Sequence, residues 1–416
     1  MKVAIIGAGI SGLSAAQILQ KQQHEVCIYE KSDRPGGLIK CTIEEGNLYH
    51  RVGGHVFNSR HEDVLEFFWN FFDRPNEFSK TIRNAKILLQ DKLVGYPIEN
   101  FLYQLDEATV ENIVNEILDL NKAGYKEPKD YNNFKEFLLG NFGSTLYTTY
   151  FEPYNKKIWQ CNLEEVSIDW LEGKLPMPNY NEMLANSILR KGEDEMVHSS
   201  FYYPNNNGSQ FVADRLAEGL NIKYNYTINS IELSEGKWLI DNKTYDTLVY
   251  TADVRRLNTI IKNLPAEVKE SCTKIEGLQS NGTSNVLCEI SAFEDNSWIY
   301  LPENNITAHR IILTGNFAQS NNRAGTKTCV VEFSGEIAPD EMNAEIAKLP
   351  GNLKPIAYNY EPNTYVIQDS NTRHNINELK DKLSSHNLFL HGRFAEWEYY
   401  NMDTAMKASL DKFNNY

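Results

Sequence analysis

The sequence predicts an α/β protein, and three observations near its start lead to this expectation. The apolar residues 3–6 run directly into Gly7, Gly9 and Gly12, which form a G-x-G-x-x-G pattern. A segment rich in small residues follows, and a second apolar run then ends at Glu30. The order of strand, glycine turn, helix and strand is the context in which such glycines bind a dinucleotide. We therefore predict a Rossmann-type domain.

Each residue of this pattern has a physical role in such a domain. Gly7 allows the tight turn, Gly9 lets the backbone approach a pyrophosphate, and Gly12 lets helix and strand pack closely. The free N–H groups at the helix start then meet the phosphate charge. Glu30 is placed to accept hydrogen bonds from an adenosine ribose. An ordinary βαβ unit with coincidental glycines is the alternative, and the complete context argues against it.

A second glycine pair indicates which dinucleotide binds. Residues 34–37 read Arg-Pro-Gly-Gly and follow the acidic strand end. This segment resembles the second glycine motif of the large FAD-binding fold that includes amine oxidases, protoporphyrinogen oxidase and UDP-galactopyranose mutase. Pro-Gly-Gly is also good turn chemistry by itself. In combination with the first motif, FAD is the stronger prediction.

Composition excludes several classes of protein. The chain has 416 residues and a net charge of −15, and this charge argues against nucleic-acid binding, which needs a basic surface. No apolar run approaches the length of a membrane span, so we expect no integral membrane segment. The six cysteines are scattered without a C-x-x-C pair, which predicts buried thiols in a reducing compartment and no metal site. We expect a cytoplasmic protein.

The organisation along the chain predicts three parts. The FAD-binding domain is discontinuous and comprises residues 1–60, 200–256 and 385–416. A helical insertion covers residues 61–83 and 97–199, where apolar residues recur at helical spacing. A mixed β-sheet substrate domain covers residues 84–96 and 257–384, and it begins with a hairpin-like stretch at residues 84–96.

Four further segments carry candidate functional residues. In the first, Gly53 and Gly54 bring the backbone close to a flat group, and His55 follows at once; a His that caps the next helix is an equally good interpretation. In the second, residues 151–159 interleave aromatic residues with lysines that can stack a base and hold phosphate. An amphipathic helix with its lysines in solvent is the favoured interpretation of the second segment taken alone.

The other two segments place arginines beside aromatic residues. Arg310 opens an apolar strand close to Tyr300, where it suits bidentate contact with phosphate or a salt bridge at the rim. Gly392 and Arg393 precede a run of aromatic residues and a helix start. Asp403 suits the N-cap of that helix, whose dipole can face an anionic group on a flavin.

Taken in order along the chain, these segments resemble the UDP-galactopyranose mutase family. The likeness rests on the glycine fingerprint, Gly-Gly-His-Val at 53–56, Tyr-Pro at 96–97, Pro-Tyr-Asn at 153–155 with the following Trp, Trp-x-Tyr at 298–300 with the following Arg, and Gly-Arg-Phe at 392–394 with the following Tyr and Asp. This resemblance implies a flavoenzyme that interconverts the pyranose and furanose forms of UDP-galactose. In the family, N5 of reduced FAD attacks the anomeric carbon and displaces UDP, and the sugar recloses on another ring oxygen from the resulting adduct.

The resemblance also implies residue roles. It implies catalytic roles for His55, Arg310 and Arg393. It implies cofactor contacts from Gly7, Gly9, Ile10, Ser11, Gly12, Glu30, Lys31, Gly36, Gly37, Gly53, Gly54, Gly392, Arg393, Met402 and Asp403. It implies substrate contacts from Glu99, Tyr154, Asn155, Trp159, Lys174, Tyr300, Arg310, Tyr365, Tyr399 and Asn401.

This sequence departs from the family pattern at three positions, Glu99, Lys174 and Asn401. At these positions the family carries a Gln, an Arg and an Asp, respectively, so the departures bear on sugar and nucleotide specificity. The partners implied are a small nucleotide sugar and, as electron source for reduced FAD, NAD(P)H or another external reductant. The resemblance allows a homo-oligomer and implies a role in polysaccharide biosynthesis. An FAD-dependent oxidase or dehydrogenase of the amine-oxidase or protoporphyrinogen-oxidase type is the alternative, because one fold supports several chemistries.

Overall fold

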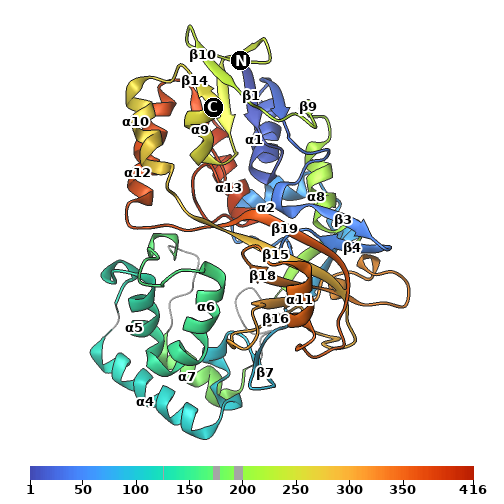
Figure 1. Cartoon of the computed structure of the whole chain (residues 1–416), viewed down its shortest axis with the longest axis vertical. Helices are drawn as coiled ribbons and strands as arrows, with labels where there is room; N and C mark the ends of the chain where they lie inside the picture. Colours follow the sequence, from blue (N-terminus) through green and yellow to red (C-terminus); the bar gives the residue numbers. More distant parts are fainter. Residues whose placement is uncertain (125, 172–178, 192–199) are drawn as a thin grey trace.

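The computed structural model describes residues 1–124, 126–171, 179–191 and 200–416 (Figure 1). The first part of the molecule contains a parallel five-stranded sheet with the order β20-β13-β1-β2-β9. In that order the strands are Leu388–Leu390, Thr247–Tyr250, Lys2–Ile6, Glu25–Tyr29 and Ile222–Lys223. Segments far apart in the sequence therefore meet in one Rossmann-type sheet, which confirms the predicted fold class.

The strand β1 shows why this sheet is covered on both faces. Val3 and Ile5 belong to one buried cluster and Ala4 and Ile6 to another, as expected for a parallel strand between two layers of helices. On the first face pack α1 (Ile10–Lys21), α2 (Glu62–Trp69), α8 (Gly208–Ala217) and α13 (Met402–Phe413). On the second face pack α9 (Leu257–Ile260), α10 (Ala266–Ile275), α12 (Thr372–Ser384) and a small sheet of β12 (Lys243–Tyr245), β11 (Lys237–Ile240), β10 (Ile231–Ser234) and β14 (Ile261–Lys262).

The position of α10 and α12 differs from the predicted division of the chain. Both lie within residues 257–384, which we assigned to the β-sheet domain, yet their apolar residues share a buried cluster with β13 and β20. No change in composition marks the point where the chain leaves one core and enters the other. The domain boundaries as a whole stay a prediction.

A seven-stranded mixed sheet forms the second part of the molecule, with the order β19-β15-β18-β17-β16-β6-β7. In that order the strands are Lys354–Val366, Ser280–Glu289, Thr328–Ser334, Arg310–Ile312, Trp298–Tyr300, Ala85–Leu89 and Lys92–Gly95. The predicted hairpin at residues 84–96 is thus confirmed as β6 and β7 at the edge of this sheet. Helix α11 (Pro339–Ile346) packs in a buried cluster with this sheet.

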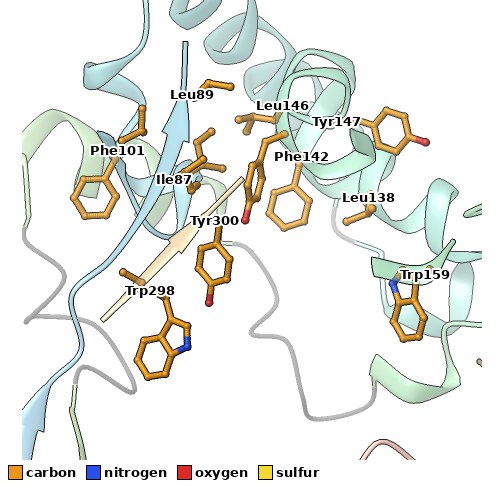
Figure 2. Packing of buried hydrophobic residues seen from close by; sticks show 14 of the residues in the cluster. Ile87, Leu89, Phe101, Leu138, Phe142, Leu146, Tyr147, Trp159, Trp298 and Tyr300 are labelled. Carbon is orange, nitrogen blue, oxygen red and sulfur yellow. The ribbon is translucent and has the colours of Figure 1, made fainter. Parts of the chain in front are cut away.

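Helices from the predicted insertion form the third part. They are α4 (Glu107–Ala123), α5 (Phe134–Leu146), a π-helical turn at Tyr147–Phe151, α6 (Glu152–Trp159) and α7 (Tyr180–Leu189). Figure 2 shows Ile87, Trp298 and Tyr300 on the strands next to Phe142 and Leu146 on α5. One buried cluster therefore joins these helices to the seven-stranded sheet.

Shorter elements complete the described chain. They are β3 (Cys41–Glu44), β4 (Asn47–His50), α3 (Arg74–Glu77), β5 (Phe78–Ile82) and β8 (Ser200–Pro204). Among the described residues, no helix is both long and apolar enough to span a bilayer.

The start of the last helix differs from the expectation. Asn401, not Asp403, is the N-cap of α13: its side chain pairs with the helix backbone, and the Thr404 side chain pairs back with the Asn401 backbone in a capping box. Both residue types are good caps, so the sequence alone favoured the wrong one of two neighbours. Asp403 lies in the first turn.

Candidate functional site

The two glycine loops of the Rossmann-type domain lie against each other. Gly36 donates its N–H to the carbonyl of Ala8 at 2.8 Å and pairs with Gly9 in an isolated bridge. A Cβ at Gly9 would meet no atom nearer than the Gly37 Cα at 3.9 Å. The two loops therefore leave room above Gly9 at the amino end of α1, where, among the described residues, no side chain caps the helix.

Gly7 and Gly12 have a different role from Gly9. Gly7 has a φ of +104°, and a Cβ there would lie 2.6 Å from Thr251 Oγ1. A Cβ at Gly12 would lie 2.0 Å from the carbonyl oxygen of Gly7. Gly12 thus lets α1 approach the end of β1, and Gly7 lets the turn pass close to Thr251 after β13, whereas Gly9 leaves space for a ligand.

Glu30 lies at the end of β2 and is only 5% exposed. Its carboxylate accepts hydrogen bonds from the N–H groups of Ala8 and Ser32, at 2.8 and 2.9 Å. Lys40 Nζ lies 3.8 Å away, and Lys31 is exposed. Glu30 thus connects the first glycine loop to the segment after β2, and its oxygens lie at the carboxyl end of the parallel sheet.

The C-terminal segment reaches the same place. Gly392 has a φ of +92°, and a Cβ there would lie 2.6 Å from Ser11 Oγ, in the first turn of α1. Arg393 follows and donates to the carbonyl oxygens of Thr364, at 2.9 Å, and Tyr400, at 3.2 Å. The structure therefore brings Gly392 and Arg393 next to the glycine loops.

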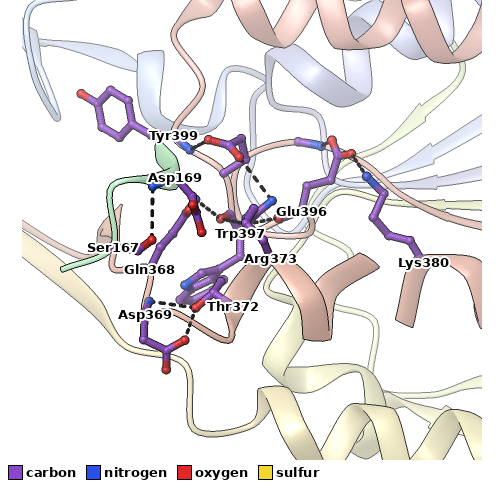
Figure 3. A network of polar contacts seen from close by, with 12 residues as sticks. Ser167, Asp169, Gln368, Asp369, Thr372, Arg373, Lys380, Glu396, Trp397 and Tyr399 are labelled. Atoms are coloured by element: carbon purple, nitrogen blue, oxygen red, sulfur yellow. Dashed lines mark hydrogen bonds and ion pairs between the residues drawn. The ribbon is translucent and has the colours of Figure 1, made fainter. Parts of the chain in front are cut away.

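A buried polar network holds this segment in place (Figure 3). Glu396 is 3% exposed and accepts hydrogen bonds from Lys380 at 2.9 Å, Lys412 at 2.8 Å and the Gly392 N–H at 2.9 Å. Burial raises the pKa of Glu396, but His391 and the lysines outweigh burial and hold that pKa well below its usual range. Glu396 is therefore an ionised anchor for the segment that carries Arg393.

His55 lies between the second glycine loop, where its ring hydrogen-bonds the backbone of Leu38, and Glu332 of the seven-stranded sheet. Its Nε2 atom is buried and has no hydrogen-bond partner among the described residues. Burial, followed by the positive charge of Arg393, lowers the pKa of His55 to about 4. The helix that follows begins at Glu62 with His61 as its N-cap, so His55 does not cap it. A neutral imidazole with one unpaired nitrogen remains for a ligand.

Glu332 on β18 connects the loop before His55 to Arg310. It is fully buried, accepts the Gly53 N–H at 2.7 Å and forms an ion pair with Arg310. Burial raises the pKa of Glu332, but Arg310, His309 and the Gly53 N–H outweigh it and hold that pKa well below its usual range. The ion pair of Arg310 is thus internal and not at the rim.

Tyrosine side chains surround Arg310. Its side chain is 20% exposed, and its guanidinium donates to the Tyr365 hydroxyl at 3.2 Å. Tyr300 pairs with Arg310 across β16 and β17, and the ring of Tyr154 lies 5.4 Å from the ring of Tyr300, centre to centre. Among the predicted substrate residues, the structure therefore gathers one cation and three hydroxyl groups in one cluster.

An aromatic wall extends from this cluster to Arg393. The rings of Tyr365 and Tyr399 are stacked with centres 6.0 Å apart, and the Arg393 guanidinium carbon lies 4.6 Å from the Tyr399 ring centre. Trp159, 4% exposed, lies 6.4 Å from Tyr365 and 5.2 Å from Trp170, ring to ring. Flat, apolar surfaces therefore adjoin the cations.

Other predicted residues have different surroundings. The Asn155 amide donates to the Phe151 carbonyl at 2.7 Å, within its own helix. Asn401 is exposed and caps α13. Met402 is buried at the start of α13, where burial raises the pKa of Asp403. Lys174 lies outside the described residues.

Glu99 follows β7 in a short 3-10 helix, Ile98–Asn100, and burial raises its pKa to about 7. Because the native state binds this proton more tightly than the unfolded chain does, stability contributed by the neutral carboxyl is lost as the pH rises from about 4.5 through 7. Relative to the wild type, we expect the free energy of unfolding of Glu99→Gln to rise by about 2–3 kcal/mol between pH 5 and pH 8.

Thermal unfolding of both proteins at the two pH values measures this difference. The exposed Glu111→Gln on α4 is the control, and it should shift the unfolding temperature equally at pH 5 and pH 8. A constant difference between Glu99→Gln and the wild type would contradict the raised pKa.

Sequence reasoning missed two residues of this cluster. One is Glu332, although a single acidic residue inside the apolar run 329–333 is a signal for a buried, paired charge. The other is Arg83, which donates to the Tyr300 hydroxyl at 2.9 Å and lies over the rings of Tyr96 and Trp298. No local pattern singles out Arg83, because its partners lie on other segments.

The residues present fit an FAD. Gly9 and Gly37 form a cradle that a Cβ would narrow, the amino end of α1 suits the pyrophosphate, and the unpaired His55 Nε2 suits a flat polar ring. The thiol, carboxylate and imidazole groups of the described residues form no cluster of three or more that could hold a metal.

Comparisons with known proteins agree with this geometry. Residues 5–72 match the family described as an NAD(P)-binding Rossmann-like domain. The chain is 26% identical to dTDP-fucopyranose mutase of Escherichia coli over 211 residues, which are 49% of this chain and 55% of the mutase. It is 31% identical to L-amino acid oxidase of Bothrops pictus over 156 residues, which are 33% of this chain and 31% of the oxidase. The chain thus spans about a third to about half the length of these two relatives.

Solved structures extend the similarity to the whole chain. Reduced UDP-galactopyranose mutase superposes with a TM-score of 0.87 at 21% identity, over 99% of this chain and 94% of that one. A putative protoporphyrinogen oxidase from an Exiguobacterium species superposes with a TM-score of 0.73 at 12% identity, over 99% and 98% of the two chains. The resemblance predicted from the sequence is confirmed at the level of the fold: the chain has the fold of UDP-galactopyranose mutase and of the putative protoporphyrinogen oxidase, with a Rossmann-like domain at residues 5–72.

Proposed function

We propose that this protein is a flavin-dependent nucleotide-sugar mutase that interconverts UDP-galactopyranose and UDP-galactofuranose, or the two ring forms of a close nucleotide sugar. The observation that carries the proposal is the cluster of Arg310 with the hydroxyls of Tyr154, Tyr300 and Tyr365 beside the cofactor loops. A cation with several O–H donors is the chemistry that binds a diphosphate.

FAD would lie along the glycine loops, with its pyrophosphate at Gly9 and the start of α1 and its ribose at Glu30. His55, Arg393 and Gly392 would lie near its flavin end. Reduced flavin, when bound, would supply the nucleophile for the anomeric carbon of the sugar. NAD(P)H or another external reductant would keep it reduced.

The protein's own residues would act mainly on the leaving diphosphate. Arg310 stays charged because Glu332 is its buried partner, and the tyrosine hydroxyls can donate to the phosphate oxygens. Such preorganised donors stabilise the negative charge that develops on the leaving group. No residue of the cluster has to exchange a proton in this step.

The aromatic wall would orient the sugar. Trp159 and Tyr365 present flat surfaces beside the diphosphate cluster. A sugar held against them has its anomeric carbon in a fixed position, which lowers the entropic part of the activation barrier. Buried aromatic groups also exclude water from the reacting centre.

A hydride-transferring oxidase or dehydrogenase is the second candidate, and the 31% identity to an L-amino acid oxidase favours it. That match covers 33% of this chain, however, and the Rossmann-like match at residues 5–72 belongs to the cofactor domain. The Arg310 cluster argues against an oxidase of amines or apolar substrates, which needs no anion site. An amino-acid oxidase would use such a cation for the carboxylate of its substrate, and the assay below separates that activity from the mutase.

The test is a turnover assay on purified protein reduced under anaerobic conditions. It is incubated with UDP-galactopyranose and, separately, with dTDP-fucopyranose, and the furanose forms are sought by chromatography and NMR. We expect conversion with reduced flavin and none with oxidised flavin. Hydrogen peroxide formed from an amino acid or amine, without any furanose product, would contradict the proposal and support the oxidase.

A further inference from the structure

Helix α6 carries two adjacent lysines with opposite environments. Lys156 has a side chain that is 52% exposed and forms an ion pair with Glu152 at 2.8 Å, one helical turn earlier. Lys157 is only 9% exposed. An amphipathic helix with its lysines in solvent therefore accounts for Lys156 and not for Lys157.

The ammonium group of Lys157 is buried among backbone carbonyls. Its Nζ donates to the carbonyl oxygens of Leu301 at 2.7 Å, Glu303 at 2.6 Å and Ala308 at 3.2 Å. An ammonium has three N–H donors, so each one has an acceptor. Burial lowers the pKa of Lys157 to about 8, against the opposing charges of Glu303 and Glu345.

These carbonyls belong to one loop, which joins the two strands that carry Tyr300 and Arg310. Residues 301–308, together with His309, connect β16, which ends at Tyr300, to β17, which begins at Arg310. The Leu301 N–H donates to the His309 carbonyl at 3.0 Å and closes the base of the loop. Because Leu301 and Ala308 lie at the two ends of the loop, Lys157 bridges its base.

The proposed substrate site has one side on strands β16 and β17, with Tyr300 and Arg310, and the other side on helix α6. Tyr154 lies one turn before Lys157, and Trp159 lies two residues after it. The ring of Tyr154 contacts the ring of Tyr300, with centres 5.4 Å apart. Lys157 is thus anchored between the two residues of α6 that line the site.

We propose that Lys157 is a positioning residue: it fixes α6 to the loop 301–308 and so sets the spacing between the two sides of the substrate site. This inference rests on the proposed function for the identity of the substrate. The bridge itself is independent of that function. A second contact, from the Asn281 amide to the Ile158 carbonyl at 2.7 Å, ties α6 to β15, so the helix stays attached to the sheet when the Lys157 bridge is removed.

Lys157→Met tests the proposal, because methionine keeps the apolar stem and removes all three donors. We expect the amides of residues 301–309 to exchange hydrogen about tenfold faster or more, because three buried carbonyls lose their partner. The KM for the nucleotide sugar should rise about tenfold while kcat changes less than threefold, and FAD content should be unchanged. Lys156→Met is the matched control and should leave all four quantities at their wild-type values.

Two outcomes would overturn the proposal. One is a Lys157→Met protein with the same exchange in residues 301–309 as Lys156→Met. The other is faster exchange spread over the whole chain, with kcat and KM changed alike, which would indicate a purely structural lysine. If Lys157→Met does not fold, Lys157→Gln, which keeps two N–H donors, should give an intermediate exchange rate and KM, and a wild-type result would contradict the bridge.

A failure of the proposed function can be recognised separately. In that case the wild type shows no mutase turnover, yet hydrogen exchange in residues 301–309 still distinguishes Lys157→Met from Lys156→Met. Hydrogen exchange then remains the test of the bridge, because it does not depend on the identity of the substrate.

Discussion

Replacing Glu332 with alanine is expected to lower the stability of the protein by about 3–5 kcal/mol and to lower kcat/KM by roughly 100-fold. The substitution leaves the guanidinium of Arg310 without its buried counter-ion and the Gly53 N–H without its acceptor. Both the diphosphate cluster and the loop before His55 lose the group that holds them. Chemical denaturation measures the first effect, and the mutase assay measures the second.

A surface ion pair on the same sheet provides the control. Glu289 pairs with Arg323 at 2.9 Å, where the two side chains are 28% and 49% exposed. Glu289→Ala should cost less than about 1 kcal/mol and leave turnover unchanged, because solvent screens exposed pairs. Equal losses in the two variants would show that Glu332 has no special role.

The pH dependence gives an independent check on Glu332. Its pKa in the folded protein lies far below the ordinary value of 4.5. The ionised carboxylate therefore contributes stability that is complete above about pH 4.5 and is lost as the pH falls toward the folded-state pKa. The stability difference between wild type and Glu332→Gln should accordingly be constant from pH 5 to pH 8 and shrink below pH 4.5.

Local patterns predicted the Rossmann-type part of the fold well. All of its signals lie within the first 30 residues: the apolar run, the glycine fingerprint and Glu30. In the structure these residues also contact one another, since Glu30 accepts the N–H of Ala8. The helical spacing predicted over residues 97–199 corresponds there to α4, α5, α6 and α7, because an apolar stripe at helical spacing is a strong signal.

The substrate half could be predicted only as separate motifs. Arg310 and Tyr365 lie 55 residues apart in the chain, and no local signal shows that their side chains meet. The role of Lys157 depends on a loop that lies 144 to 151 residues later. Pairing between distant strands decides such contacts, so motif reading found several of the residues but neither Glu332 nor the bridge at Lys157.

The two neighbouring glycines Gly9 and Gly12 allow cofactor binding to be separated from folding. A Cβ at Gly12 would lie 2.0 Å from a backbone oxygen that cannot move without displacing β1 or α1. We therefore expect Gly12→Ala to cost about 3 kcal/mol or more in stability, at or above the usual range for overpacking. The same variant should retain little FAD, because the start of α1 is displaced.

Gly9→Ala should behave in the opposite way. The φ of Gly9 is −77°, which alanine adopts without strain, and its Cβ would meet no atom within less than 3.9 Å. The apoprotein should therefore unfold at the wild-type temperature. Its methyl group would occupy the space through which a pyrophosphate approaches the backbone, so the affinity for FAD should fall roughly 10- to 100-fold.

Thermal unfolding of the apoproteins and titration with FAD, followed by flavin fluorescence, measure the two effects. Gly277→Ala is the control, because a Cβ there would meet nothing within 4 Å and the residue lies outside the glycine loops. Wild-type FAD affinity in Gly9→Ala would mean that the pyrophosphate does not approach this loop. If instead Gly9→Ala loses FAD affinity while its apoprotein keeps the wild-type stability, the space above Gly9 serves cofactor binding alone. The tight contact at Gly12 is then needed for folding, because it sets the packing of α1 against the end of β1.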